Sequence, residues 1–520
     1  MLFKPAALAA FAGLAAATAI VTPAKVAHDD GGFIYGAQRG SYPGLDQGDD
    51  GSDECPPGNG NGDSPSSSAS PASSASSMSA PASTATYTSV SAPASSPAAS
   101  SSVSSAPASS TTATSTSQPY WATAYTATDK DFIAAAAATA KTSHKTSHVH
   151  GAAFDRILMI MFENTDLSVA ISDPNFAHYA DQGVLLTNHY GLTHPSQPNY
   201  IAAVMGDHFG CNSDDMLFVH ENISTIVDLL EDAGISWSSY EEDLPFSGAE
   251  GFKYDSLVTK GSSDVRKHAA AKLANSVAGS EERLSYIKNI SFVDPEMSIF
   301  HQELADNLLP QWMWMTPNLT SDAHDSNITV AGNWLRNFID NVLEKDEHFM
   351  DRTVIFITFD ENVTQDKGNQ VLGVLYGDAI PEKYRGTKDD AYFDHYSMLA
   401  SVTANWNLPT LGRNDVGANV WRFVADQTGD KIRAWDTTMG PFPLLNDSYA
   451  GPLNDKTINQ QRYPAPNLNI KTTTGRGVSP SIKKIWQNSD APTYYDEAVN
   501  VFTGSFPPKG FATVGHPETD

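Results

Sequence analysis

The sequence is poor in cysteine, in basic residues and in long apolar runs beyond its N-terminus. Two cysteines, Cys55 and Cys211, occur among 520 residues, so at most one intramolecular disulfide can form. After residue 24 no apolar stretch reaches the roughly 20 residues of a transmembrane helix, so we expect no stable membrane insertion. Lysine and arginine total 32 against 60 aspartates and glutamates, and the resulting net charge of −28 argues against nucleic acid and anionic membranes as partners.

The first 150 residues form three segments that differ in composition and that we do not expect to pack into a domain. Residues 1–24, with Lys4 before an alanine- and leucine-rich run, are typical of a secretory signal peptide. Residues 25–62 are rich in glycine and aspartate, and we expect them to be disordered. Residues 63–150 are mostly Ser, Thr, Ala and Pro and are typical of an O-glycosylated stalk and linker, with a short helix over 129–141.

These segments predict a secreted protein whose stalk would also suit association with a cell wall. His144, His148 and His150 end the stalk without a carboxylate or cysteine partner nearby in the sequence, so we interpret them as part of a solvated linker. Secretion also suits the asparagine-linked glycosylation sequons, which are Asn222, Asn289, Asn318, Asn327, Asn362 and Asn446.

Residues 151–424 show the alternation of strands and helices that is typical of an α/β domain. Arg156–Phe162 and Thr353–Phe359 are short, continuously apolar runs of the kind that form buried parallel strands, and Val371–Tyr376 follows as a third strand. Helical patterns over Ile223–Ala233 and Ala331–Leu343 lie between the first two. The sequence therefore predicts a mostly parallel central sheet with helices on both faces. Residues 425–520, rich in Pro, Asn and Gly, are expected to form a loop-rich extension that wraps the domain.

Two of the predicted strands end in acidic residues, at the edge where open α/β sheets bind ligands. Glu163 and Asn164 follow the first strand, and Asp360 and Glu361 follow the second. Carboxylate oxygens are suitable ligands for a hard divalent cation, whereas a single carboxylate at a strand end more often caps a helix. The pair of acidic strand ends therefore indicates a metal site.

Ser196 lies between two prolines in the stretch Leu192–Tyr200, ahead of the apolar run Ile201–Met205. Because proline fixes φ and has no backbone donor, we expect Ser196 on a stiff turn rather than inside the helix that follows. A hydroxyl and free backbone N–H groups near a helix N-terminus form an anion site, and an ordinary proline-rich turn is the alternative. A metal beside this serine would lower the pKa of its hydroxyl.

Three further segments carry groups that phosphoryl transfer requires. Asp322, His324 and Asp325 occupy a turn after the strand-like segment Gln311–Met315, and His395 stands near the start of the helical pattern Met398–Ala404. Lys267 and His268 follow Arg266 and add positive charge. Each residue alone suits a surface or capping role, but together they supply charge neutralisation and a proton donor for a leaving group.

Five segments of the chain, in this order, resemble the phosphoesterase family of fungal secreted acid phosphatases. That family also includes bacterial acid phosphatases and non-haemolytic phospholipases C, within the alkaline-phosphatase-like superfamily. The resemblance spans residues 154–424. It rests on Ile157–Glu163, Thr193–Asp207, Pro317–Asn327, Thr353–Glu361 and His395–Trp406.

The resemblance implies a metal-assisted acid phosphatase that hydrolyses small phosphomonoesters through a phosphoserine intermediate. Two-metal members of the superfamily have histidine and aspartate where this chain has Glu361 and Asn318, so one divalent metal ion, of unknown identity, is expected. The implied catalytic residues are the nucleophile Ser196, the phosphoryl-binding Asn199, and His324 or His395 as proton donor. The implied substrate-binding residues are Asn164, Lys267 and His268, and the implied metal ligands are Glu163, Asp360, Glu361 and Asp322.

Two other functions fit the same residues. A phosphodiesterase of phospholipase C type would use them with a larger leaving group, and a cell-surface or wall glycoprotein would have lost the activity. The chain has no basic amphipathic stretch, which favours a soluble phosphate ester over a membrane lipid. The sequons Asn318 and Asn362 adjoin proposed site residues, and we expect both to stay unmodified because a glycan there would obstruct the pocket.

Overall fold

The computed structural model describes residues 130–255, 263–364, 368–434, 447–458, 461–495 and 513–514. The predicted signal peptide (1–24), the Gly/Asp-rich segment (25–62) and the stalk up to residue 129 lie outside the described residues, as do Cys55 and Asn446. Among the helices of the described part, none combines the length and the apolar character needed to cross a membrane.

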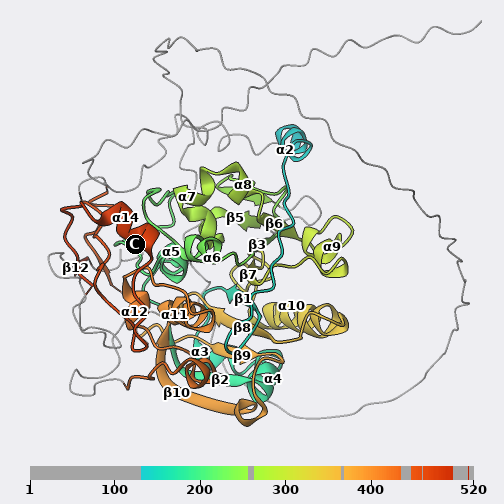
Figure 1. Ribbon diagram of the computed structural model, residues 1–520. Helices are drawn as coiled ribbons and strands as arrows, with labels where there is room; N and C mark the ends of the chain where they lie inside the picture. Colours follow the sequence, from blue (N-terminus) through green and yellow to red (C-terminus); the bar gives the residue numbers. More distant parts are fainter. Residues whose placement is uncertain are drawn as a thin grey trace, which may run out of the picture. The chain divides into compact units, whose positions relative to one another are not determined.

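An eight-stranded sheet forms the centre of the domain, in the order β10-β2-β9-β8-β1-β7-β3-β6 (Figure 1). Strand β9 pairs antiparallel with both of its neighbours and every other pair is parallel, so seven strands share one direction. The predicted mostly parallel sheet is therefore confirmed. The strands are β1 (Arg156–Phe162), β2 (Val184–Tyr190), β3 (Trp237–Glu242), β6 (Ile287–Ile290), β7 (Trp312–Thr316), β8 (Thr353–Phe359), β9 (Gly373–Tyr376) and β10 (Thr387–Asp394).

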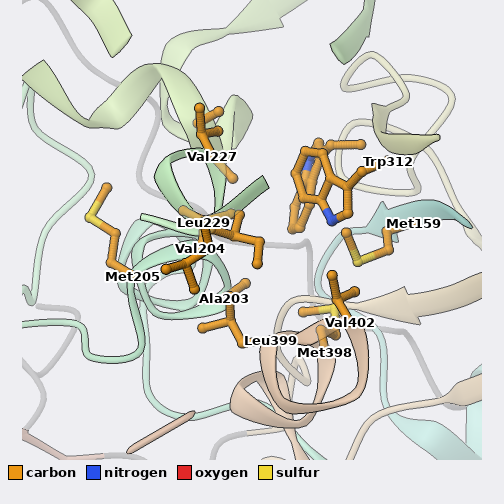
Figure 2. Packing of buried hydrophobic residues seen from close by; sticks show 14 of the residues in the cluster. Met159, Ala203, Val204, Met205, Val227, Leu229, Trp312, Met398, Leu399 and Val402 are labelled. Carbon is orange, nitrogen blue, oxygen red and sulfur yellow. The ribbon is translucent and has the colours of Figure 1, made fainter. Parts of the chain in front are cut away.

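Helices cover both faces of this sheet, and alternate residues of β1 point into two separate apolar clusters. Met159 belongs to the cluster beneath α5 (Ser196–Met205), α6 (Ile226–Asp232) and α11 (His395–Asn405), as Figure 2 shows. Ile160 belongs to the cluster beneath α4 (Pro174–Gln182) and α10 (Ile328–Asn341). Because both faces of the strand are buried, its sequence is continuously apolar rather than alternating.

Shorter elements connect these layers. Two small antiparallel ladders join β4 (Lys253–Asp255) to β5 (Ser263–Val265) and β11 (Ser448–Tyr449) to β12 (Thr513–Val514). The remaining helices are α2 (Lys130–Ala137), α3 (Leu167–Ala170), α7 (Asn275–Ala278), α8 (Glu281–Leu284), α9 (Ile299–Ala305), α12 (Asn414–Gly417), α13 (Arg422–Thr428) and α14 (Pro480–Trp486). Short 3-10 turns are η1 (Arg266–His268), η2 (Ala270–Leu273), η3 (Leu343–Lys345) and η5 (Glu382–Tyr384).

The predicted elements agree with the structure in kind and differ at their ends. Strands β1 and β8 have the predicted bounds, whereas the third predicted strand begins at Gly373 and runs antiparallel. The 13 residues between β8 and β9 lead into an antiparallel neighbour, which needs no crossover helix. Helix α6 begins after Thr225, whose hydroxyl closes a capping box, and α10 begins after Asn327, whose side chain accepts from two backbone N–H groups.

Residues 141–150, here called the strap, have exposed histidines, as the predicted solvated linker would, but the strap also hydrogen-bonds to the domain. The strap hydrogen-bonds to α9 and to the residues that precede β7 and β1. His144 Nδ1 lies 2.7 Å from Glu303 Oε1, and Ser147 Oγ lies 2.7 Å from Gln311 Oε1. His150 Nδ1 lies 2.9 Å from Asp155 Oδ2, one residue before β1. The strap is thus an integral part of the folded domain.

The segment after α13 packs on the loop that follows α5. The hydroxyls of Tyr449 and Tyr495 both donate to the buried carboxylate of Asp207, at 3.0 Å and 2.6 Å. Asn454 donates to the carbonyl of Gly210 at 3.1 Å. The predicted boundary at residues 424 and 425 falls inside α13 and stays a prediction.

Candidate functional site

Glu163 and Asp360 leave neighbouring strands side by side at the carboxyl edge of the sheet. Strands β1 and β8 pair in parallel with Phe162 opposite Phe359, so the next residue of each strand emerges at the same level. Both carboxylates are completely buried. The backbone N–H groups of Asn164 and Glu361 donate to Asp360 Oδ1 at 3.2 Å and 2.7 Å, which holds the two strand ends together.

Ser196 is the first residue of α5, so the prediction that it lies on a turn outside the helix is wrong. Pro195 is the N-cap and Pro198 falls in the first turn. Proline is tolerated there because the first N–H groups of a helix have no intrahelical acceptor. Ser196 Oγ donates to Glu163 Oε2 at 3.0 Å, and the hydroxyl of Tyr200, one turn further along, donates to Glu163 Oε1. Residues four apart share a helix face, so both hydroxyls meet one carboxylate.

Asn199 organises the loop before Ser196 instead of presenting a free amide. Its Oδ1 accepts from the backbone N–H groups of Leu192 and Thr193 at 2.8 Å and 3.3 Å. Its Nδ2 donates to the Thr193 carbonyl at 2.7 Å and to Glu361 Oε2 at 3.3 Å. His194 Nδ1 lies 3.0 Å from the same Glu361 oxygen. The structure thus links Glu361 to the serine loop.

His268 lies among the predicted metal ligands, although the sequence suggested a substrate contact. One ligand atom from each of Glu163, His268 and Asp322 lies within 4.8 Å of the others, and all three residues are buried. His268 Nε2 lies 3.3 Å from Glu163 Oε1, and the ring stacks on Tyr200 with centroids 5.0 Å apart. Asp322 reaches the cluster from the loop after β7. These three side chains can hold a cation.

The burial of these carboxylates also favours a bound cation. Burial raises the pKa of Glu163 well above its usual range, helped by the charges of Asp360 and Asp322 and opposed by Lys267. Burial and then the charge of Glu361 raise the pKa of Asp360 to about 8. Within the described residues, Asp322 Oδ2 and Asp360 Oδ2 have no hydrogen-bond partner. Buried acceptors without donors are rare in folded proteins, and a divalent cation would satisfy them and neutralise the charge.

The two histidines proposed as proton donors have different environments. His395, the first residue of α11, is completely buried with Nε2 2.6 Å from the main-chain carbonyl of Asp360. Burial lowers the pKa of His395 to about 4, so a neutral ring donates to that carbonyl. His324 keeps 15% of its side chain exposed, its Nδ1 lies 2.8 Å from Asp325 Oδ1, and its backbone N–H donates to Asp322 Oδ1. Of the two, His324 is the one whose side chain is partly exposed.

Three residues of the site escaped the sequence reasoning, namely His194, Tyr200 and Asp214. Tyr200 had a usable signal, because it stands four residues after Ser196 in the same helical pattern. Asp214 Oδ2 lies 2.5 Å from Lys267 Nζ, so the predicted substrate-binding lysine is paired with a loop that the sequence did not single out.

The two sequons beside the site are buried. Asn318 is 5% exposed and its Nδ2 donates to Asp243 Oδ2 at 2.8 Å. Asn362 is 2% exposed and its Nδ2 donates to the Thr364 carbonyl at 2.7 Å. Both amide nitrogens are therefore engaged inside the folded domain.

This combination of a mostly parallel sheet with a buried serine, carboxylates and histidines at its carboxyl edge is typical of an α/β enzyme, and three of these side chains could hold a cation. The sequence model described as "Phosphoesterase family" matches residues 40–409. The chain belongs to the Phosphoesterase family, as its five segments predicted, and it is a phosphoric ester hydrolase.

Two fungal relatives match about 70% of this chain with about 40% identity, and a bacterial relative matches half of it with lower identity. A probable acid phosphatase of Kluyveromyces lactis is 42% identical over 356 residues, which cover 68% of this chain and 81% of the relative. An acid phosphatase of Aspergillus fumigatus is 41% identical over 393 residues, covering 73% of this chain and 85% of the relative. A phosphatidylinositol-3-phosphatase of Mycobacterium tuberculosis is 24% identical over 263 residues, covering 50% and 79%.

Proposed function

We propose that this protein is a secreted acid phosphatase that hydrolyses small phosphomonoesters through a phosphoserine intermediate, with assistance from a divalent metal ion. One observation carries the proposal: the Ser196 hydroxyl stands at the N-terminus of α5 and donates to Glu163, beside the buried carboxylate of Asp360. The names of the two fungal relatives support the acid phosphatase assignment.

The side chains of the site divide the chemistry between them. Ser196 Oγ attacks phosphorus and passes its proton along its hydrogen bond to Glu163 Oε2, and Glu163 returns this proton to the serine oxygen when the phosphoserine is hydrolysed. The Ser196 N–H at the N-terminus of α5 receives a phosphoryl oxygen, because Pro198 has no N–H and the Gln197 N–H donates to Asp214. His324 protonates the leaving oxygen and then takes a proton from the water that hydrolyses the phosphoserine. His395 does not touch the reacting atoms and acts by fixing the Asp360 main chain.

The carboxylates of Glu163, Asp360, Glu361 and Asp322, together with His268, would hold the divalent ion. Burial and the charges of Lys267 and His324 keep the pKa of His268 well below its usual range, and a neutral imidazole is a competent ligand. The ion would polarise the phosphoryl group and lower the pKa of the Ser196 hydroxyl. Exhaustive chelation should abolish turnover, and added divalent ions should restore it. Full activity after chelation would show that the reaction needs no metal ion.

Replacing Ser196 by alanine tests the nucleophile. We expect Ser196→Ala to lower kcat on a chromogenic phosphomonoester at least about 1000-fold, with an unchanged unfolding temperature. Ser401→Ala, which alters another buried helical serine, serves as control. Rapid quench with a labelled monoester should give a phosphoenzyme in the parent and none in Ser196→Ala. Wild-type turnover in Ser196→Ala would refute the mechanism.

Secretion and glycosylation are part of the proposal and need their own test. Residues 1–24 and the sequons support secretion, and Asn327 is exposed at the start of α10. We expect the mature protein to lack residues 1–24 and to carry a glycan at Asn327 but none at the buried Asn318 or Asn362. N-terminal sequencing and glycopeptide mapping of the protein from its own secretory pathway would check this, and full occupancy at Asn362 would contradict the site. The stalk and linker of residues 63–150 are the part that would associate with a cell wall.

A further inference from the structure

Thr316, the last residue of β7, makes two hydrogen bonds through its hydroxyl. The indole N–H of Trp314 donates to Thr316 Oγ1 at 3.1 Å, and Thr316 Oγ1 donates to the main-chain carbonyl of His268 at 3.1 Å. All three residues are buried. An indole N–H can only donate and a carbonyl can only accept, so these two partners fix the direction of the hydroxyl. Thr316 therefore always presents its proton to the His268 main chain.

This bond joins the turn η1 to the central sheet. Trp314 and Thr316 are two residues apart and share one face of β7, whereas His268 ends η1, 48 residues earlier in the chain. Strand β7 is paired on both sides, with β1 and with β3. The hydroxyl thus ties the main chain of His268 to a strand whose own position is fixed by two neighbours.

The His268 ring lies between an aromatic support and acidic side chains. It stacks on Tyr200 with centroids 5.0 Å apart, and Trp314 packs beside the same tyrosine with centroids 6.0 Å apart. His268 Nε2 lies 3.3 Å from Glu163 Oε1, and Nδ1 lies 3.9 Å from Asp322 Oδ2. Within the described residues Nε2 is buried and has no hydrogen-bond partner, which suits a metal ligand.

We propose that Thr316 is a positioning residue, whose hydroxyl holds the main chain of His268 so that the imidazole can share a divalent ion with Glu163 and Asp322. This inference rests on the proposed function, because the ion is part of that proposal. A purely structural role for Thr316, as a bond that only fastens η1 to the sheet, is the competing explanation.

Zinc binding by the chelated full-length protein tests this role without turnover. Thr316→Val removes the hydroxyl and nearly keeps the shape of the side chain. We expect it to bind Zn²⁺ about tenfold more weakly than the parent by calorimetry, because partners that orient a metal ligand contribute to metal affinity. Thr316→Ser keeps the hydroxyl and should bind Zn²⁺ like the parent. Thr403→Val is the matched control, since Thr403 is a buried threonine whose hydroxyl donates to the main-chain carbonyl of Ala400.

A double-mutant cycle with His268→Gln separates positioning from a structural role. If Thr316 acts through the histidine, adding Thr316→Val to His268→Gln should change Zn²⁺ affinity by less than about twofold. A structural role predicts a lower unfolding temperature for Thr316→Val with parent-like Zn²⁺ affinity. That outcome, or an undiminished loss of affinity in the His268→Gln background, would overturn the positioning role and leave the phosphatase assignment intact.

Trp314→Phe replaces Thr316→Val in this experiment if the valine variant does not fold. It removes the donor that orients the Thr316 hydroxyl, so Zn²⁺ binding should weaken about threefold, and parent-like binding would overturn the positioning role. A parent protein that binds no Zn²⁺ would overturn both the positioning role and the metal assistance. If the parent binds Zn²⁺ but forms no phosphoenzyme, the proposed mechanism fails and the positioning role stands.

Discussion

Ser196 and Tyr200 donate to the two oxygens of one buried carboxylate, Glu163. The phenol keeps its proton, because burial and the nearby carboxylates raise the pKa of Tyr200 well above its usual value. One oxygen of Glu163 is thereby fixed, and the other is left facing the serine. The tyrosine orients the carboxylate on which the proposed proton transfer depends.

Replacing Tyr200 by phenylalanine tests this orientation. Tyr200→Phe leaves Glu163 Oε1 without its hydroxyl donor, and an unpaired buried acceptor costs about 1–3 kcal/mol. We expect kcat to fall roughly tenfold or more while KM changes little, because the proton transfer and not ground-state binding is disturbed. Tyr179→Phe, a buried tyrosine on the opposite face of the sheet, is the matched control for steady-state kinetics. Parent-like kcat in Tyr200→Phe would show that Glu163 needs no such support.

His324 can be tested as the proton donor by varying the leaving group. We expect His324→Gln to slow hydrolysis of an alkyl phosphate about 100-fold, because a basic alkoxide needs protonation as it departs. Nitrophenyl phosphate, whose leaving group is stable as an anion, should be slowed much less. His348→Gln, at an exposed position near the amino ends of the strands, is the control. An equal loss on both substrates would assign His324 to another role.

At the scale of elements, the strap is expected to stabilise the domain. His144 approaches Glu303, a buried carboxylate that also accepts from Tyr240 and Lys288, and Ser147 approaches Gln311. Replacing both strap residues by alanine should lower the free energy of unfolding by about 2 kcal/mol, at roughly 1 kcal/mol per hydrogen bond. Urea unfolding would measure this, with the exposed pair Lys145→Ala and His148→Ala as control. Equal stability of the two double variants would show that the strap contacts do not stabilise the domain.

Elements buried on both faces by apolar neighbours were predictable from the sequence, and elements with polar interiors were not. Strands β1 and β8 are apolar throughout, and their predicted bounds are confirmed. Strand β3, Trp237–Glu242, is equally buried but four of its six residues are serines and glutamates. Glu241 is neutralised there by Lys272 Nζ at 2.9 Å, a partner 31 residues away. No local sequence pattern predicts such a distant partner.

In the site, too, the sequence indicated residues with a local signal but not contacts between distant segments. The strand-end carboxylates and Ser196 each follow a local signal, namely an apolar run or a proline pair. His194 against Glu361 and His268 against Asp322 are contacts between loops far apart in the chain, so their distances became visible only once the strands were ordered in the sheet.

For the whole molecule, two sets of buried groups give opposite responses to pH. Burial lowers the pKa of His189 and His395. Their contribution to stability is complete above about pH 6.5 and is lost as pH falls, because the unfolded chain takes up protons first. Burial raises the pKa of Glu242 and Asp394 to about 7, so the folded protein keeps these carboxyls protonated at pH values where the unfolded chain ionises them. Their stabilising contribution is complete below about pH 4 and is lost as pH rises through 7.

Replacing Glu242 by glutamine isolates the second set. The folded protein holds the Glu242 proton up to about pH 7, whereas the unfolded chain releases it near pH 4. Relative to the parent, Glu242→Gln should therefore gain stability as pH rises from 4 to 7, by at most about 1.4 kcal/mol per unit. Urea unfolding of chelated protein across this range would measure the gain, with the exposed Glu347→Gln as control. A constant difference between Glu242→Gln and the parent would contradict the raised pKa.

The strap also determines which edge of the domain would face a surface to which the preceding chain is attached. Its contacts with Gln311 and Asp155 bring the preceding chain in at the amino ends of β7 and β1, whereas Ser196 and Asp360 stand beyond the carboxyl ends of the sheet. A support or fusion partner coupled ahead of residue 141 would therefore hold the domain by the edge remote from its chemistry. Coupling through the loops that follow β1, β7 or β8 would instead bring the support to the mouth of the site.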